Sequence, residues 1–127
     1  MNMVKRKILA VDDEPSFTRM LKRNLERTGA YEVEEENLGT RCLSTARRFH
    51  PDLILLDIIM PDVEGHFLLS QFKTDQTTRS IPIVFLTATL TKEEMRKNKG
   101  ALEGVPALAK PVDMRLLLSC IEKYLKK

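Results

Sequence analysis

The chain has 127 residues, of which 43% are hydrophobic and 31% charged, the balance of one globular domain that buries its own core. Its 21 Lys and Arg residues and 18 Asp and Glu residues give a formal net charge of +3, which is too weak to indicate binding to nucleic acid. The sequence has no apolar run long enough for a membrane span and no signal-peptide pattern, so we expect a cytoplasmic protein and not a membrane protein. It has no Cys-x-x-Cys pair, so we expect Cys42 and Cys120 to be reduced thiols, and neither a disulfide scaffold nor a zinc ribbon.

Five short segments rich in Val, Ile and Leu are predicted to be β-strands. Three of them are apolar almost without interruption, and the segment 31–35 instead alternates between apolar and acidic residues. Continuous apolar runs are typical of central strands that helices cover on both faces, whereas alternation is typical of an edge strand. In chain order the predicted strands are 7–11, 31–35, 52–56, 81–86 and 105–109.

Helical patterns lie between these strands. The first helix follows Pro15 and ends at Gly29, as the preferences of the first helical turn and of the helix end predict. Three others are indicated by apolar residues at helical spacing, over 42–49, around 67–72 and over 114–125, the last capped by Asp113. Thr91 followed by Glu94 is a capping box that predicts a further, mostly polar helix.

The regular alternation of strands and helices predicts the fold class. A β-strand followed by a helix and a parallel strand forms a right-handed crossover, and repeating that unit builds a parallel sheet with helices on both faces. We therefore expect one α/β domain over residues 1–127, with three layers, a five-stranded parallel sheet of order 2-1-3-4-5 and five helices.

Polar residues follow the predicted strands where ligands of such sheets bind. Asp12 and Asp13 end the first strand and Asp57 ends the third, and these two strands are neighbours where the strand order reverses. Two like charges about 4 Å apart cost on the order of 4 kcal/mol at an effective dielectric constant near 20, so such a cluster must hold a proton or a cation. Carboxylate oxygens are ligands that suit Mg²⁺.

Two further residues complete this predicted site. Thr87 and Lys110 end the fourth and fifth strands, and a hydroxyl and an ammonium can hold a tetrahedral anion opposite a metal ion. A metal, a lysine and a hydroxyl around one ionised carboxylate predict transfer of a phosphoryl group to that carboxylate.

Four segments of the chain resemble the receiver domains of bacterial two-component response regulators. They are the residues 8–15, which include Asp12 and Asp13, the residues 57–65, the pair Thr87-Ala88 and the pair Lys110-Pro111. The resemblance covers the whole chain and implies a flavodoxin-like fold and a switch that phosphorylation operates. It implies a sensor histidine kinase or a histidine phosphotransfer protein as phosphoryl donor, and Mg²⁺ as cofactor.

The resemblance also implies a role for each residue of the site. Asp57 is similar to the phosphoacceptor, and Asp12, Asp13, Asp57 and the backbone carbonyl of Ile59 to the magnesium ligands. Lys110 would pair with the phosphoryl oxygens, and its bond to Pro111 would be cis. Thr87 would move to hydrogen-bond the phosphoryl group and so report its presence.

Some positions depart from the family pattern or have a simpler interpretation. Ala107 occupies the position, three residues before the lysine, where receivers usually carry an aromatic residue, so we expect the signal to run through Thr87 and the backbone of the fourth helix. Ile59 and Thr89 would border the phosphoryl group, and because Ile59 cannot orient water we expect slow loss of that group. Gly65 is expected where a Cβ would clash, and we assign His50 and His66 no part in phosphoryl transfer.

The most favoured function is that of a receiver with no output domain in this chain, which signals by binding a protein partner or by passing the phosphoryl group on. The resemblance implies a contact surface on the fourth helix, fifth strand and fifth helix, which could also form a homodimer, and we expect no direct contact with nucleic acid or membrane. One alternative is a receiver-like interaction module that works without phosphorylation. An aspartyl-phosphate phosphatase is disfavoured because Ile59 replaces its second acid, and a flavin site is disfavoured because Asp12 and Asp13 would repel a phosphate.

Overall fold

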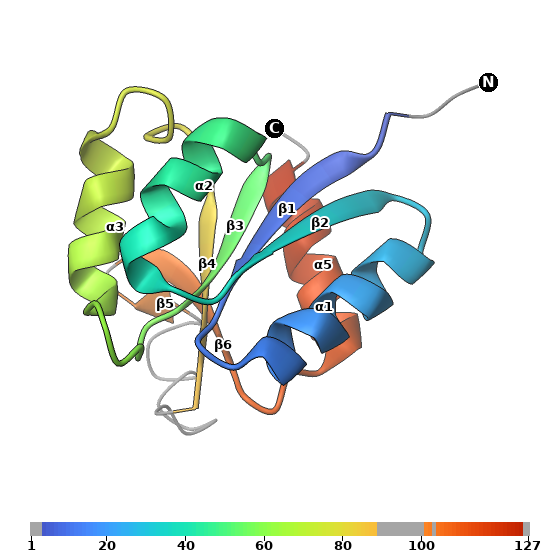
Figure 1. Cartoon of the computed structure of the whole chain (residues 1–127). Coiled ribbons are helices and arrows are strands. Elements are labelled where there is room, and N and C mark those ends of the chain that lie inside the picture. The colour runs from blue at the N-terminus through green and yellow to red at the C-terminus, as the bar shows by residue number, and fades with distance from the viewer. Residues whose placement is uncertain (1–3, 89–100, 103, 126–127) are drawn as a thin grey trace.

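In the computed structural model, which describes residues 4–88, 101–102 and 104–125, a β-sheet lies between two layers of helices. Figure 1 shows α2 and α3 over one face of the sheet and α1 and α5 over the other. The order of the strands is β2-β1-β3-β4-β6-β5. Their bounds are β1 (Arg6–Val11), β2 (Tyr31–Glu36), β3 (Leu53–Asp57), β4 (Ile83–Thr87), β5 (Ala101–Leu102) and β6 (Val105–Ala109).

The five longer strands form the parallel sheet that the sequence predicts. Strands β1, β3, β4 and β6 pair in parallel with their neighbours, and β2 pairs in parallel with β1 at one edge. With β6 as the fifth predicted strand, the predicted order 2-1-3-4-5 is confirmed. The carboxyl ends of all these strands therefore lie along one side of the sheet.

A short strand that the sequence did not predict extends the five-stranded parallel sheet at the other edge. The short strand β5 pairs antiparallel with β6, through Ala101 with Pro106 and Leu102 with Val105. Gly104 has a φ of +80°, a left-handed conformation that glycine adopts without strain and that lets the chain turn directly into β6. A strand of two residues is too short to show alternation, so the sequence pattern did not reveal it.

Four α-helices lie within the described residues, whereas the sequence predicted five. They are α1 (Pro15–Arg27), α2 (Cys42–Phe49), α3 (Gly65–Thr74) and α5 (Met114–Leu125), and a short 3₁₀ helix η1 (Gly39–Arg41) leads into α2. The helix predicted from Thr91 and Glu94 lies outside the described residues. Within the described part of the chain, no helix combines the length and apolar character that crossing a membrane requires.

The helix boundaries follow from local chemistry. Pro15 occupies the first turn of α1, where its missing N–H is not needed. His50 ends α2 in the left-handed conformation, and the side chain of Asp113 accepts hydrogen bonds from the first turn of α5, at 2.9 Å from the amide of Arg115. The predicted cap of the last helix is therefore confirmed.

Two apolar clusters hold the helices on the sheet. Successive residues of a strand point to opposite faces, so Leu56 belongs to one cluster and Leu55 to the other. The cluster under α2 and α3 includes Leu9, Val11, Cys42, Ala46, Phe49, Ile54, Leu56, Leu68, Phe72 and Phe85. The cluster under α1 and α5 includes Ile8, Ala10, Leu21, Leu25, Leu53, Leu55, Val84, Leu86, Leu117 and Ile121.

Both cysteines are free thiols, as the sequence predicts. Cys42 is buried in the first cluster, and its Sγ donates to the carbonyl of Leu38 at 3.3 Å. Burial, together with the negative charges of Glu36 and Asp62, raises the pKa of the Cys42 thiol to about 12. This thiol is therefore an unreactive part of the core.

Candidate functional site

Three carboxylates meet at the carboxyl edge of the sheet. Asp12 follows β1, Asp13 follows Asp12, and Asp57 is the last residue of β3, the strand beside β1. One oxygen from each carboxylate lies within 4.8 Å of the other two. Asp12 is only 1% and Asp57 only 5% exposed, whereas Asp13 is exposed. Two of the three carboxylates are therefore buried, and the third lies on the solvent side of the cluster.

The ammonium group of Lys110 faces these acids. The Nζ of Lys110, just beyond β6, forms an ion pair with Oδ2 of Asp12 and lies 3.5 Å from Oδ2 of Asp57. The same Nζ lies 4.3 Å from the centre of the Phe17 ring in α1, a cation–π arrangement. The peptide bond between Lys110 and Pro111 is cis, as the resemblance implied. The ammonium group of Lys110 is thus shared between the buried carboxylates of Asp12 and Asp57.

Backbone N–H groups orient the two buried carboxylates. The amide of Glu14 donates to Oδ1 of Asp12 at 2.9 Å, and the amide of Ile59 donates to Oδ1 of Asp57 at 3.1 Å. Each buried carboxylate therefore uses one oxygen on the backbone and turns the other toward Lys110. This arrangement leaves the acids pointing toward a common space above the strand ends.

The surroundings shift the pKa values of Asp57 and Lys110. Burial raises the pKa of Asp57, although the amide of Ile59 and the charge of Lys110 act in the opposite direction. Burial alone would lower the pKa of Lys110, but its hydrogen bond with Asp12 and the charges of Asp57 and Asp12 together raise it. Lys110 therefore stays charged, while Asp57 carries its negative charge at a cost in free energy.

Thr87 ends the strand next to Asp57 but faces differently. Its side chain is completely buried, and its backbone carbonyl accepts a hydrogen bond from the amide of Lys110 at 2.8 Å. By the alternation of β4, Thr87 follows Phe85 on the side of α2 and α3, whereas Asp57 follows Leu55 on the side of α1 and α5. The structure thus brings Asp12, Asp13, Asp57 and Lys110 together and places the threonine at the end of the neighbouring strand.

In the loop after β3, the backbone of residue 65 lies close to the backbone of Ile58, and only a glycine allows this approach. A Cβ at this glycine would lie 2.4 Å from the backbone oxygen of Ile58, far inside van der Waals contact. The close approach lets the Gly65 amide donate to that same oxygen at 3.0 Å, and a bridge joins Ile59 to Glu64. The predicted steric role of Gly65 is confirmed. Ile59 is 56% exposed beside Asp57.

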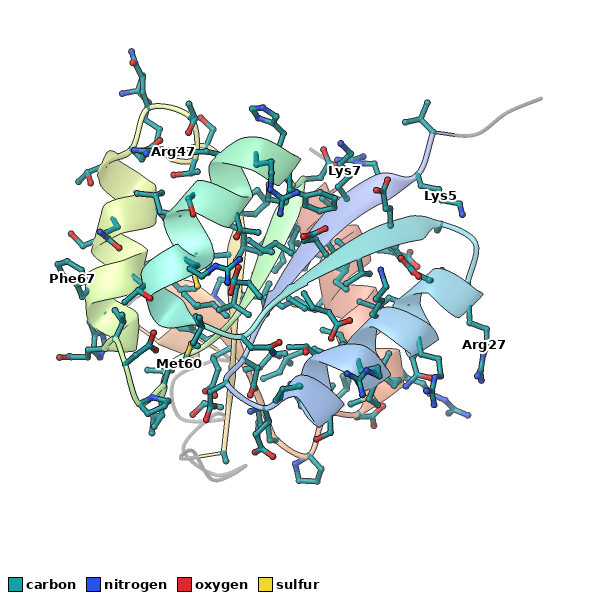
Figure 2. All side chains as sticks on the ribbon, in the orientation of Figure 1. Lys5, Lys7, Arg27, Arg47, Met60 and Phe67 are labelled. Carbon is teal, nitrogen blue, oxygen red and sulfur yellow. The ribbon has the colours of Figure 1, made fainter. Side chains whose placement is uncertain are left out.

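Several polar residues of α1 and α2 have a structural role. Glu14 is the N-cap residue of α1, and His50 is an exposed helix end. Arg47 and Arg48 on α2 form ion pairs with Asp75 and Glu34. Figure 2 shows Arg47 beside the segment that follows α3, while Phe67 points outward from α3. Thr89 lies outside the described residues.

The sequence pattern did not reveal the residues that hold the acid-bearing loops. The Nδ2 of Asn37 donates to the carbonyl of Asp12 at 2.8 Å and to Oγ1 of Thr18 at 3.0 Å. Both carboxylate oxygens of Asp62 accept backbone N–H groups, from Gly39 and Thr40, each at 3.1 Å. A polar residue directly after β2 was the only sequence signal for Asn37, and such residues are common in loops.

Comparison with known proteins gives the family. Residues 8–122 match the family model of the response regulator receiver domain. The chain belongs to the response regulator receiver family. It is 32% identical over 119 residues to the polar-differentiation response regulator DivK of Brucella ovis. This match covers 93% of the chain and 94% of DivK.

Further similar proteins agree with this assignment. The chain is 31% identical over 122 residues to the transcriptional regulator RpaA of Synechocystis, a match that covers 95% of this chain and 49% of RpaA, so the chain spans about half the length of that relative. Among solved structures, the chemotaxis protein CheY4 of Vibrio cholerae superposes with a TM-score of 0.81 at 30% identity, over 96% of this chain and 100% of CheY4.

Membership in the family establishes the general function. The chain is a receiver domain of two-component signalling, whose family function is a switch based on phosphorylation. Receiver domains bind Mg²⁺ through acidic residues, and they act with histidine kinases or downstream partners. The donor set of Asp12, Asp13 and Asp57 fits that ion, because it consists of hard carboxylate oxygens with no thiolate or imidazole.

The cost of the Asp57 charge can be measured by substitution. Asp57→Asn is expected to raise the free energy of unfolding at neutral pH without metal, because it removes a carboxylate whose pKa folding raises. The midpoint of thermal unfolding, followed by circular dichroism in EDTA, should therefore be higher than that of the wild type.

The stability gained by Asp57→Asn should depend on pH. A raised carboxyl pKa destabilises the folded state above that pKa, so the gain should vanish as the pH falls toward the ordinary value of 3.8. Asp75→Asn is the control: Arg47 and Thr77 lower the pKa of Asp75 to about 2, so its removal should destabilise the protein at neutral pH. An Asp57→Asn protein that is less stable than wild type at pH 7 would show that this interpretation is wrong.

Proposed function

We propose that Asp57 is the phosphoacceptor of this receiver and that its donor is a phosphohistidine of a sensor kinase or of a histidine phosphotransfer protein. The observation that supports this most is the position of Asp57 among Asp12, Asp13 and Lys110 at one edge of the sheet. Asp57 is the only one of the three acids that belongs to β3, and one of its oxygens faces the ammonium group. Within the described residues, no other group of at least three acids, histidines or cysteines is close enough to share a metal ion.

In the reaction, an oxygen of the ionised Asp57 carboxylate attacks the phosphorus of the donor. The new O–P bond forms as the P–N bond breaks, and the imidazole nitrogen of the donor leaves with the electron pair of that bond. The Lys110 ammonium stabilises the phosphoryl oxygens, which carry the developing negative charge. The raised pKa of Lys110 keeps it charged throughout the physiological range.

Asp12, Asp13, Asp57 and the backbone carbonyl of Ile59 hold Mg²⁺ in this proposal. The ion supplies charge neutralisation for the acids and for the transferred group. Asp12 and Asp57 are each fixed through one oxygen by a backbone amide, so their other oxygens are oriented in advance. Asp13 is exposed and gives the ion its route from solvent.

Thr87 reads the phosphorylated state. Its hydroxyl turns toward the phosphoryl group, and this movement shifts the backbone of the segment that follows β4. Ala107 lies in β6 opposite Phe85 of β4 and is buried, so it leaves no aromatic side chain to change position with Thr87. The signal therefore runs through the backbone to a surface formed by the predicted fourth helix together with β6 and α5.

We also propose that residues 1–127 work as a single receiver domain that assists its own phosphorylation and dephosphorylation. The match to DivK over 94% of that protein's length supports an independent receiver. The output is a protein partner, a second copy of the chain or onward phosphoryl transfer, in the cytoplasm. A receiver-like module that works without phosphorylation is the second candidate, and Ala107 favours it.

Phosphoryl uptake distinguishes these two functions. Wild-type protein and Asp57→Ala are incubated with acetyl phosphate, or titrated with beryllofluoride, with Mg²⁺ and with EDTA. We expect labelling and beryllofluoride binding only for the wild type with Mg²⁺, because only that sample has both the acceptor oxygen and the ion. Labelling of Asp57→Ala would place the acceptor elsewhere, and no reaction of the wild type would favour the module.

Ile59 predicts the lifetime of the phosphorylated state. Its exposed side chain beside Asp57 has no group that can orient a hydrolytic water. Ile59→Asn adds such a group and should shorten the half-life of the phosphoprotein by up to about tenfold, the factor of roughly 1.4 kcal/mol that one good hydrogen bond can supply. Ile59→Val is the apolar control and should leave the half-life unchanged at the same Mg²⁺ concentration. An Ile59→Asn phosphoprotein as long-lived as the wild type would contradict the prediction.

A further inference from the structure

The segment 36–40, which runs from the last residue of β2 into η1, contacts both loops that carry the acids. At its first end it holds the backbone of Asp12 from two sides. The amide of Asp12 donates to the carbonyl of Glu36 at 3.1 Å, and the carbonyl of Asp12 accepts from Nδ2 of Asn37 at 2.8 Å. The position of Asp12 is therefore set by residues that lie about two dozen positions later in the chain.

At its other end, the segment holds the loop that follows Asp57. The amides of Gly39 and Thr40 each donate to one oxygen of Asp62, and these hydrogen bonds lower the pKa of that carboxyl. The two loops touch closely here, because a Cβ on Gly39 would lie 2.9 Å from Cβ of Val63 and 2.9 Å from Oδ1 of Asp62. Only a residue without a side chain fits between the loops at this distance.

Hydrogen bonds to neighbouring elements keep the segment in one conformation. Thr18, a buried residue of α1, accepts from Asn37 and donates from Oγ1 to Oε1 of Glu35 at 2.7 Å. Glu36 is also buried, and its carboxylate accepts from Oγ1 of Thr45 at 2.6 Å and from the amide of Leu38 at 3.0 Å. Since these partners lie in α1, β2 and α2, the segment is fixed to elements outside the acid cluster.

We propose that the segment 36–40 sets the separation between the Asp12 and Asp57 loops, and that Asn37 is thereby a positioning residue for the magnesium-binding carboxylates. Asn37 reaches the metal ligands only through the backbone of Asp12. This inference rests on the proposed function, since it takes Asp12, Asp13 and Asp57 to be the ligands. Mg²⁺ demands a nearly ideal octahedral arrangement, so a small change in that separation weakens binding.

The test compares magnesium affinity with fold stability in the full chain. Mg²⁺ alone is titrated calorimetrically into the wild type and into Asn37→Ala and Gly39→Ala. Neither substitution changes the net charge of the protein. We expect each substitution to weaken Mg²⁺ affinity by about tenfold or more, as loss of groups that orient metal ligands typically does. Unfolding midpoints measured in EDTA report the structural cost separately.

Thr78→Val is the matched control. Thr78 is buried and donates from Oγ1 to the carbonyl of Phe72 at 2.7 Å, so its substitution also removes a buried hydrogen bond between a side chain and the backbone, but beyond the far end of α3. We expect Thr78→Val to lower the unfolding midpoint and to leave the Mg²⁺ affinity at the wild-type value. A purely structural role for Asn37 would give the same pattern for Asn37→Ala, and that result would overturn the proposal.

The outcomes separate this inference from the proposed function. If the wild type binds no Mg²⁺, or if Asp13→Asn binds Mg²⁺ as tightly as the wild type does, the proposed metal site itself is contradicted. Wild-type protein that binds Mg²⁺ through Asp13, together with unchanged affinity in Asn37→Ala and Gly39→Ala, would overturn only the role of the segment. If Asn37→Ala does not fold, Gly39→Ala decides alone, because it retains every hydrogen-bonding group of the segment.

Discussion

Repulsion among three carboxylates is the interaction on which the site depends. Asp12 and Asp57 are buried, Asp13 lies within reach of both, and Lys110 supplies only one positive charge. Like charges at such separations cost several kcal/mol unless a cation or a proton compensates them. Burial raises the pKa of Asp57, and the amide of Ile59 and the charge of Lys110 offset this effect only in part. A divalent cation is therefore complementary to the excess negative charge that the fold itself gathers at this edge of the sheet.

The scaffold can carry this imbalance because two apolar clusters, one on each face of the sheet, hold the strands up to the residues that precede the acids. Leu9 and Leu55, for example, are completely buried in opposite clusters, a few residues before the acids of the same strands. The stability of the sheet comes from such residues, and the strand ends are free to hold groups that destabilise it. Function and stability are thus assigned to different parts of the same strands.

The sequence predicted the features that depend on nearby residues. The apolar runs at 7–11, 52–56 and 81–86 revealed three central strands, and the residues that follow them revealed the acids, because burial on both faces leaves polar residues only at the ends. The sequence missed β5, which has only two residues, and the contact of Asn37 with Asp12, which joins positions 25 apart. The face on which Thr87 lies also followed only from the exact strand register.

If a divalent ion completes the acid cluster, the free energy of unfolding of the wild-type chain depends on the Mg²⁺ concentration. Measuring this dependence is the most direct test of the metal site. Binding to the folded state alone should increase the free energy of unfolding with the logarithm of the ion concentration, by about 2.7 kcal/mol at one hundred times the dissociation constant. Denaturant unfolding at constant ionic strength, with Na⁺ replacing Mg²⁺ as the reference, gives this quantity. A free energy of unfolding that does not change between EDTA and saturating Mg²⁺ would contradict the account.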